Sequence, residues 1–470
     1  MKKRAVLLAL LAFVIATVAG CQKDDDNNSS SGEKEFELLA GTFSVYDESP
    51  NAFGHAGDHL SSQNELDFFV GNSFFNQNWV MFGASTTARD GLGPTFNARS
   101  CSGCHFKDGR GRLPDYFGET TSGFLVRLSV PGEGDDGSPL PEPIYGDQFQ
   151  NQSIQDSVPY EGSVRISFET VTGQYPDGTA YSLRKPVCSF EGLAFGPMDP
   201  NTLTSIRVAN QMIGMGLLDA IPEADLLAYV DETDADGDGV SGRPNYVWNI
   251  AENTQTLGRF GWKANMPDVL QQVAGAFHGD IGITSYLFPS NNCPDPQNSC
   301  QGAALDSLGP EIDDDDLQKV VLYSSTLAVP VRRNYKDDDV VAGRKLFKKA
   351  GCISCHVETF TTGTHPTIPE LSNIEIHPYT DLLLHDMGEG LSDNRPDYLA
   401  TGLEWRTPPL WGVGLIEVVN GHSTFLHDGR ARNLEEAILW HGGEAQNAKD
   451  YFMQLNATKR SQIIAFLNSL

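Results

Sequence analysis

The chain has 470 residues and a formal net charge of −29 at pH 7, from 33 basic and 62 acidic side chains. This length is enough for two or three domains and for a large hydrophobic core, so the stability of the fold need not depend on cross-links or metals. The acidity argues against nucleic acid as a partner, because both surfaces would be negative, and it favours a basic or dipolar partner protein.

The N-terminus is predicted to be a signal peptide over residues 1–20. Three basic residues follow Met1, and the apolar run over residues 5–19 is shorter than a membrane-spanning helix and stops near Cys21. This ending resembles a lipobox, in which Cys21 carries lipid and becomes the first residue of the mature chain. An ordinary cleaved signal with an incidental cysteine is the alternative.

Residues 21–36 are polar and acidic and are expected to form a disordered, flexible tether. Lys23 followed by acids resembles a surface-export signal of some Gram-negative lipoproteins, although a plain acidic linker explains it equally well. We therefore predict an exported lipoprotein of a Gram-negative cell envelope. Its lipid would hold it to the membrane, on the periplasmic side of the outer membrane or at the cell surface.

Two C-x-x-C-H motifs are the strongest signal in the sequence. They comprise Cys101, Cys104 and His105 in the first part of the chain and Cys352, Cys355 and His356 in the second. With 8 cysteines and 11 histidines in 470 residues, chance predicts on the order of 0.003 such motifs. Two of them together are therefore not accidental.

The spacing within the motif has a chemical reason. Two thiols separated by two residues can add to the two vinyl groups of one haem, and the adjacent histidine then lies beneath the iron as its axial ligand. A redox-active cysteine pair or half of a zinc site gives no reason for the histidine. We therefore predict two covalently bound haem c groups, with His105 and His356 as iron ligands.

A glycine and a phenylalanine four residues apart precede each motif. They are Gly71 and Phe75 before the first motif, and Gly343 and Phe347 before the second. Residues four apart share a helix face, so a helix that packs through its glycine is predicted in each place.

Residues 336–470 are predicted to form one cytochrome c domain. A helix over residues 340–349 leads into the second motif, and the chain ends in an apolar helical stripe with Thr458 or Ser461 as its N-cap. Residues 37–335 are predicted to form an N-terminal haem c domain with insertions.

The N-terminal domain has a less regular pattern. Polar and β-branched residues alternate among glycines and prolines over residues 125–182, which predicts strands and loops, whereas residues 203–221 and 222–230 predict helices. The expected fold class is mainly α. It contains two c-type cytochrome haem domains, the first elaborated with β-hairpins and long loops.

An acidic loop follows these helices. Asp234, Asp236 and Asp238 alternate and Gly239 occupies the sixth position, as in the first half of an EF-hand calcium loop. The twelfth position is Asn245 instead of the usual glutamate, so calcium and a solvated acidic turn both stay open.

The remaining cysteines have simpler interpretations. Cys293 and Cys300 lie in a turn-rich stretch of an exported protein, which favours a local disulfide between them. Cys188 has no evident partner and is expected to be a buried, inert thiol.

Several blocks resemble the dihaem oxidoreductases called peroxidases or thiol oxidoreductases, which are relatives of bacterial dihaem cytochrome c peroxidases and of MauG-type enzymes. The blocks are DGLGPTFNARS at 90–100, GLLDAIP at 216–222, GRFGWK at 258–263, WRTPPLWG at 405–412 and FLHDGRARNLEEA at 425–437. The resemblance extends over nearly the whole mature chain. It implies a dihaem fold and haem cofactors.

The resemblance also suggests residues near the second haem. In the peroxidase relatives, the sixth iron ligand follows the histidine that corresponds to His427 by fourteen residues, and here that position is His441. The second haem would then have His356 and His441 as its ligands, with Met387 as the rival to His441. His427 would lie near a haem edge and shape the electron path, or it would simply fix its turn.

The first haem has no evident sixth ligand in the sequence, which would leave it open to peroxide. His55, His59, Met212 and Met215 stay as possible ligands. A peroxidase also needs a general acid-base group, for which Glu223 is the candidate, with Asp219 and Glu169 as alternatives. Each of these carboxylates is more commonly a helix cap or a solvated charge.

The function that the resemblance implies is that of a peroxidase-like enzyme. Electrons from a small donor protein, of the cytochrome or cupredoxin type, would enter at the C-terminal haem, and hydrogen peroxide would be reduced at the N-terminal haem. The alternatives are an electron-transfer cytochrome with no chemistry of its own and a MauG-like oxidase of a protein substrate.

Overall fold

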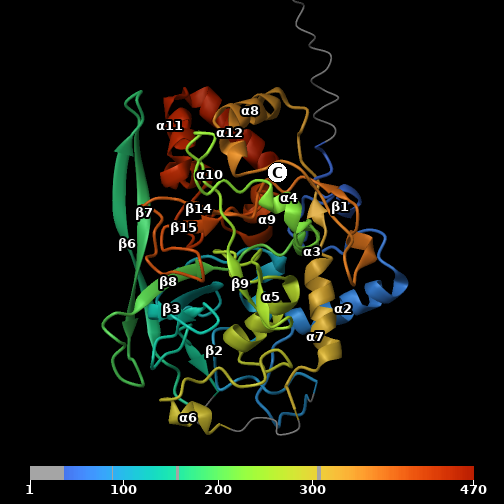
Figure 1. The fold of residues 1–470 in the computed structure, drawn as a ribbon, viewed down its shortest axis with the longest axis vertical. Helices are drawn as coiled ribbons and strands as arrows, with labels where there is room; N and C mark the ends of the chain where they lie inside the picture. The colour runs from blue at the N-terminus through green and yellow to red at the C-terminus, as the bar shows by residue number, and fades with distance from the viewer. Residues whose placement is uncertain (1–35, 87, 155–157, 304–308) are drawn as a thin grey trace, which may run out of the picture.

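The computed structural model describes residues 36–86, 88–154, 158–303 and 309–470. The predicted signal peptide, the lipidated Cys21 and the tether up to residue 35 lie outside the described residues. The structure is 28% helical and 19% strand, so the prediction of a mainly α fold is only partly right. The strands form small separate sheets among the helices (Figure 1).

The helix before the first motif packs closely on a helix distant in sequence. Helix α2 (Ser62–Asn76) begins at Ser61, whose side chain accepts a hydrogen bond from the Asn64 amide. It packs against α7 (Asp314–Ser325) at Gly71, where a β-carbon would lie 2.1 Å from the carbonyl oxygen of Lys319. The predicted packing through this glycine is confirmed.

The same arrangement occurs before the second motif. Helix α8 (Asp338–Lys349) packs against the C-terminal helix α12 (Ala457–Ser469) at Gly343, where a β-carbon would lie 1.9 Å from the carbonyl oxygen of Gln462. Asn456 caps α12 by accepting from the Lys459 amide. The predicted caps Thr458 and Ser461 are wrong, because both lie inside the helix.

Strand β3 (Phe124–Glu133) lies between β4 (Pro139–Leu140) and β8 (Leu203–Val208), and both pairings are antiparallel. The helix predicted over residues 203–221 is therefore wrong in its first part, and helix α3 covers only Met215–Asp219. Pairing with β3 decides the conformation of residues 203–208, because it satisfies their backbone groups and buries their β-branched side chains.

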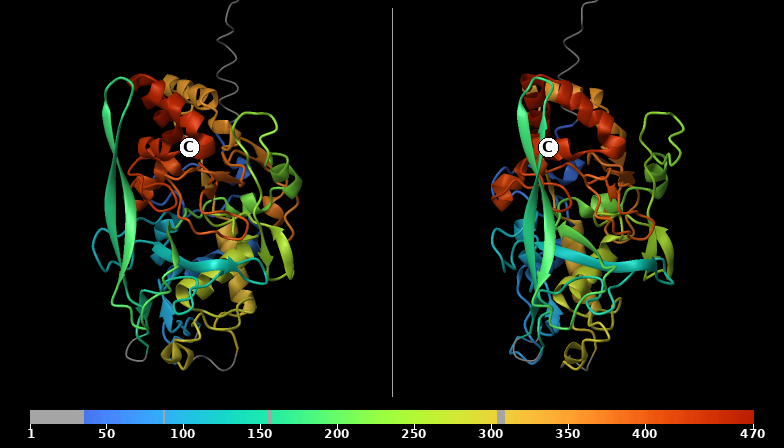
Figure 2. Two further views of the ribbon diagram at one scale, coloured as in Figure 1. Left: turned by 60° about the vertical axis from the view of Figure 1, so that its left-hand side comes forward. Right: turned by 90° about the vertical axis from the view of Figure 1, so that its left-hand side faces the viewer.

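A long hairpin extends along one side of the molecule. Its strands, β6 (Ser163–Gln174) and β7 (Ala180–Glu191), pair only with each other and reach from the lower part to the C-terminal helices (Figures 1 and 2). Near its tip, the Tyr175 hydroxyl donates to Glu435 over 2.6 Å, and Arg460 pairs with Asp177 at 3.3 Å. The hairpin thus connects the lower part of the molecule with the C-terminal helices.

Short elements complete the structure. The remaining helices are α4 (Glu223–Leu227), α5 (Val269–Ala276), α6 (Asn298–Gln301), α9 (Ile416–Asn420), α10 (Leu434–Trp440) and α11 (Gln446–Gln454). The remaining strands are β1 (Ser44–Val45), β2 (Thr95–Phe96), β5 (Gln152–Ser153), β9 (Tyr246–Asn249), β10 (Thr254–Leu257), β11 (Val329–Pro330), β12 (Phe360–Thr361), β13 (Glu375–Ile376), β14 (Leu384–Asp386) and β15 (Glu404–Arg406). Within the described ranges, no helix is both long enough and apolar enough to cross a membrane.

Candidate functional site

The first C-x-x-C-H motif begins in a 3₁₀ turn over Cys101–Gly103, after which the chain turns His105 inward. The Nδ1 atom of His105 lies 2.6 Å from the carbonyl oxygen of Asn210 and donates to it. Because that bond fixes the tautomer, the Nε2 atom keeps its lone pair for a metal. The Phe75 ring of α2 lies 6.2 Å from the His105 ring.

The second motif repeats this geometry. A 3₁₀ turn covers Cys352–Ser354, and the Nδ1 atom of His356 donates to the carbonyl oxygen of Tyr379 over 2.9 Å. The Phe347 ring of α8 lies 6.1 Å from the His356 ring. Each motif therefore presents one free imidazole nitrogen, oriented by a backbone carbonyl and flanked by the phenylalanine of the preceding helix.

The cysteines of both motifs are free thiols, whereas Cys293 and Cys300 form a disulfide with 5.7 Å between their α-carbons. The four motif thiols therefore stay available for attachment to a ligand. Cys188 is also free, and its thiol contacts the Thr204 hydroxyl.

His441 follows α10 and approaches the second motif. Its Nδ1 atom donates to the carbonyl oxygen of Ala437 over 2.7 Å, which leaves Nε2 free. Burial lowers the pKa of His356 to about 4, and electrostatic repulsion from His441 adds to the lowering, so the two imidazoles are neighbours. Met387 follows β14, and its backbone carbonyl lies against Gly442, where a β-carbon would meet it at 3.1 Å.

A cavity opens beside the first motif. Its lining includes both motif cysteines, His105 and the sulfur-bearing Met212, Met215 and Met266. Among its described lining residues, His105 is the only histidine and Asp280 is the only carboxylate.

The residues proposed from sequence for the first haem lie in different places. Met212 and Met215 line the cavity, but His55 and His59 do not, and His55 instead pairs with Asp47 at 2.6 Å. Glu223 is exposed at the start of α4 and is not among the lining residues. Sequence reasoning missed Asp280, which lies in a π-helical turn over Phe277–Ile281, a type of turn frequent at functional sites.

The cavity also has a polar side suited to an anionic ligand. Arg127, Arg207 and Arg406 contribute to its lining, although Arg127 already pairs with Asp147 at 2.6 Å and Arg207 with Asp397 at 2.9 Å. Arg406 is buried and donates to the carbonyl oxygen of Gly261 over 2.7 Å, and burial lowers its pKa to about 10. The Oδ1 atom of Asn265 is buried without a hydrogen-bond partner. A flat, largely apolar group with carboxylate substituents, such as haem, fits this lining.

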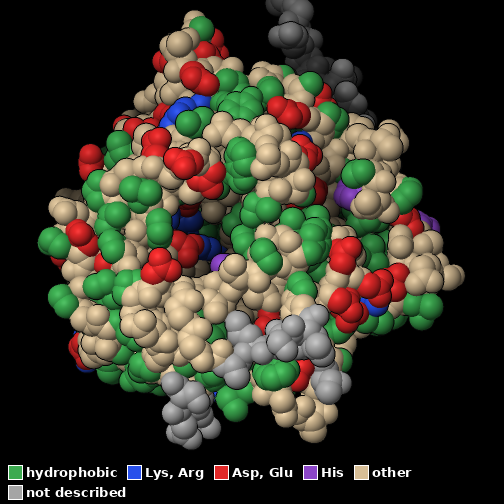
Figure 3. Space-filling view, turned by 60° about the horizontal axis from the view of Figure 1, so that its bottom comes forward, with side chains coloured by type: hydrophobic (Ala, Val, Ile, Leu, Met, Phe, Trp, Pro, Cys, Tyr) green, Lys and Arg blue, Asp and Glu red, His purple; other side chains and the backbone are tan. Residues whose placement is uncertain are grey.

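The space-filling view shows a hollow near the centre of the lower face of the molecule (Figure 3). Basic and acidic side chains and a histidine lie beside this hollow, and further charged side chains are spread over the rest of the face.

Three neighbouring aromatic rings lead away from the cavity beside the first motif. His427 stacks on Trp405 with 3.6 Å between ring centroids, and Trp262, which lines the first cavity, lies 6.4 Å from His427. Burial lowers the pKa of His427 to about 3, so its ring is neutral at pH 7. Both tryptophans lie in sequence blocks that carry the family resemblance, which is the signal that could have identified them.

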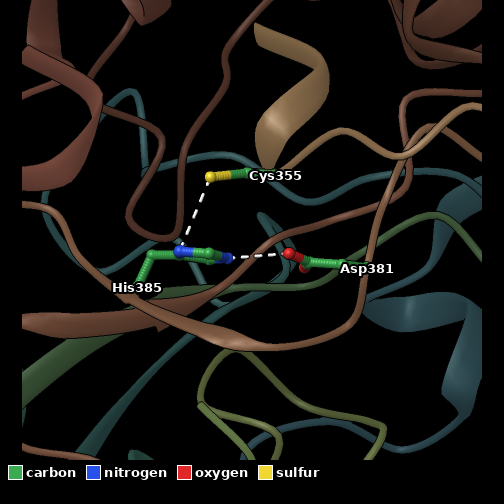
Figure 4. A group of neighbouring side chains, drawn as sticks. All are labelled: Cys355, Asp381 and His385. Atoms are coloured by element: carbon green, nitrogen blue, oxygen red, sulfur yellow. Dashed lines mark hydrogen bonds and ion pairs between the residues drawn. The ribbon is translucent and has the colours of Figure 1, made fainter. Parts of the chain in front are cut away.

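Trp405 also lies on a strand that pairs with a strand next to the second motif. It pairs across β15 and β14 with His385, whose Nδ1 atom lies 3.5 Å from the sulfur of Cys355. Figure 4 shows His385 between Cys355 and Asp381, the latter 2.8 Å from Nε2. His385 belongs to no motif of the sequence, and only the fold brings it to Cys355.

The acidic loop brings together a different trio from the predicted one. Carboxylate oxygens of Asp231, Asp234 and Asp236 lie within 4.8 Å of one another. Asp238 instead accepts from the Ser354 hydroxyl, inside the second motif, at 3.4 Å. Asn245 is buried and donates to the carbonyl oxygens of Lys263 and Asp397, away from this trio.

Comparison with known proteins identifies the family. The profile described as "Di-haem oxidoreductase, putative peroxidase" matches residues 38–470. The chain belongs to this di-haem oxidoreductase family. Haem is therefore its cofactor.

Two other comparisons add little about this di-haem oxidoreductase. No curated protein matches it. Among solved structures, hydrazine synthase of Kuenenia stuttgartiensis, pressurised with xenon, is similar at 13% identity and a TM-score of 0.35, with 100% of each chain covered.

Proposed function

We propose that this di-haem oxidoreductase is a peroxidase with haem c bound covalently at Cys101 and Cys104 and at Cys352 and Cys355. Electrons from a small donor protein enter at the second haem, and hydrogen peroxide is reduced at the first. The overall reaction consumes one peroxide, two electrons and two protons and yields two water molecules. Bound haem supplies the redox chemistry.

One observation carries this proposal, namely that the two motifs have unequal surroundings. The second has a facing imidazole with a free nitrogen, that of His441, which together with His356 would saturate an iron. The first has a cavity whose described lining offers no histidine besides His105. Peroxide can react only where the sixth position is open or labile, so the first motif is the better site for chemistry.

Asp280 is the best-placed group for proton transfer in the first cavity. Burial raises the pKa of its carboxyl group, which keeps a proton more readily available, and Gln148 orients it through a hydrogen bond of 2.7 Å. Asp280→Asn should lower peroxide turnover by about 10²- to 10⁴-fold, the usual contribution of a general acid-base group. Glu223→Gln distinguishes the two candidates, because a larger loss of peroxide turnover in this variant than in Asp280→Asn would identify Glu223 as the general acid-base group.

The ring series supports electron transfer between the two sites. Trp262, His427 and Trp405 form a series of neighbouring rings that starts at the first cavity, and Trp405 is the cross-strand partner of His385, which contacts the Cys355 sulfur. The chain's role here is to hold these rings in place. Neutral His427 adds no charge to the path, because burial keeps its pKa far below 7.

Spectroscopy of the half-reduced protein tests the proposal. Electronic and electron paramagnetic resonance spectra should show one low-spin haem with two ligands and a second haem that changes when peroxide is added. His441→Ala should leave the second haem five-coordinate, whereas Met387→Leu, the matched change in the rival ligand, should leave its spectrum unaltered.

An electron-transfer cytochrome without peroxidase activity is the second candidate. Three methionines line the first cavity, and any of their sulfurs could close the sixth position of an iron there. If both haems stay low-spin and peroxide leaves their spectra unchanged at every level of reduction, the electron-transfer function replaces the peroxidase function.

We further propose that Asp231, Asp234 and Asp236 bind calcium. This proposal is supported by the closeness of their carboxylate oxygens, which are the ligands calcium prefers. Calcium should raise the melting temperature of the protein, and Asp234→Asn should remove that effect.

We also propose that the exported chain is attached to a Gram-negative envelope through lipidated Cys21. Mass spectrometry of the mature N-terminus tests the lipid, and a lipid-free Cys21 would exclude the anchor.

A further inference from the structure

A buried cluster of charged side chains lies against the attachment site of the second haem. His385 contacts Asp381 at 2.8 Å through Nε2, and the sulfur of Cys355 is 3.5 Å from Nδ1 (Figure 4). Nδ1 also contacts Glu444 at 2.7 Å. The side chains of His385 and Asp381 are 2% and 1% exposed. Water therefore cannot screen these charges effectively.

Glu444 is held firmly as a carboxylate. Besides His385, it accepts hydrogen bonds from the backbone amides of Ser241 and Asp386, each over 2.9 Å. Burial raises the pKa of Glu444, but His385 and then these two amides outweigh it and hold the pKa below its ordinary value. Its charge is therefore present at neutral pH.

The charges in this cluster do not cancel. Burial opposes the charge on His385, but Asp381 and the Cys355 sulfur hold its pKa well above its ordinary value, so His385 carries one positive charge against the two carboxylates. Arg406 interacts electrostatically with Asp381, and Arg243, which is ion-paired with Glu404, also interacts with Glu444. Glu444 bonds to the same His385 nitrogen, Nδ1, that lies 3.5 Å from the Cys355 sulfur, so it is the carboxylate on the Cys355 side of the ring.

We propose that the His385–Asp381–Glu444 cluster sets the reduction potential of the second haem by holding net negative charge beside its attachment sulfur. Ferric haem carries one more positive charge than ferrous haem, so a negative neighbour stabilises the oxidised form and lowers the potential. A group that touches a cofactor's attachment point in this way tunes the cofactor without binding its metal. The inference rests on the proposed covalent attachment at Cys355.

The charge on Glu444 can be removed with little change of shape. In Glu444→Gln, we expect the ratio of ferrous to ferric second haem at a fixed applied potential to rise by about tenfold, which equals a rise of about 59 mV for one electron. The measurement is a spectroelectrochemical titration of the complete dihaem protein at pH 7. Asp381→Asn should shift the ratio in the same direction, but less, because Asp381 bonds to Nε2, on the side of the His385 ring away from Cys355 (Figure 4).

Glu435→Gln is the matched control. Glu435 lies in α10 close to His441 in sequence, but its carboxylate bonds to Tyr175 and not to His385. This variant removes the same charge from the same part of the chain, so its potential should stay near the wild-type value.

Two further readouts make the outcomes distinct. An unshifted potential in Glu444→Gln, with haem attached to Cys355, would overturn the inference and leave the proposed function intact. A shift accompanied by loss of the low-spin spectrum would also overturn it, because Glu444 would then act by placing His441. Mass spectrometry that finds no haem on Cys355 would overturn both the inference and the proposed attachment.

Discussion

The contact between α8 and α12 allows the sharpest prediction about stability. A methyl group added at Gly343 would lie 1.9 Å from the carbonyl oxygen of Gln462 and 2.9 Å from the β-carbon of Phe466. The nearest obstacle is backbone, which cannot swing away as a flexible side chain can. To restore an ordinary distance of 3.4 Å, the helices would have to part by about 1.5 Å.

Gly343→Ala should therefore destabilise the protein. Overpacking costs about 3 kcal/mol at the upper end of its range, and the better helix propensity of alanine returns about 1 kcal/mol, so a net loss of about 2 kcal/mol is expected. Phe466 packs on Phe347 with 5.2 Å between ring centroids, and Phe347 flanks His356. The disturbance should therefore also reach the absorption spectrum of the second haem.

Denaturant unfolding followed by circular dichroism measures the loss of stability. The absorption spectrum of the haem shows whether the disturbance reaches the second haem. Gly390→Ala is the control, since its φ is not positive and its nearest neighbour, the Trp440 ring, lies 3.7 Å away. That change should stay within about 0.5 kcal/mol of wild type. If Gly343→Ala were as stable as Gly390→Ala, the close backbone contact would not be a constraint, and the reasoning would fail.

Two other predictions concern buried groups. Burial lowers the pKa of His427 from 6.5 to about 3. As the pH falls below 6.5, His427 is therefore protonated in the unfolded chain but not in the folded one. The free energy of unfolding should fall by about 2 kcal/mol between pH 6.5 and pH 5. His427→Phe, which keeps a ring but cannot titrate, should flatten this part of the measured stability profile, and an unchanged slope would count against the assignment. Lys263→Met should cost about 3–5 kcal/mol in denaturant unfolding, because it leaves buried Asp393 unpaired, whereas Lys319→Met at the surface should cost less than about 1 kcal/mol. Equal losses for the two lysines would contradict this account.

The local features of the fold could be predicted from sequence because they depend on residues close together in the chain. The C-x-x-C-H spacing and the glycine four residues before a phenylalanine both repeat, and the structure shows the same local geometry around His105 and His356. Residues 203–208 were mispredicted because their conformation depends on β3, more than 70 residues earlier in the chain. A periodic pattern alone does not contain that pairing.

The sequence by itself indicated the family, which the comparison confirmed, and it predicted two haem-attachment motifs with His105 and His356 as iron ligands, because the chemistry of attachment requires a few residues at fixed short spacing. Only the tertiary structure brought Asp280 into the first cavity, stacked His427 on Trp405, and placed Glu444 and Asp381 on either side of His385. These groups come from distant segments. Their chemistry depends on burial and on separations of a few ångströms, which arise only when those segments pack together.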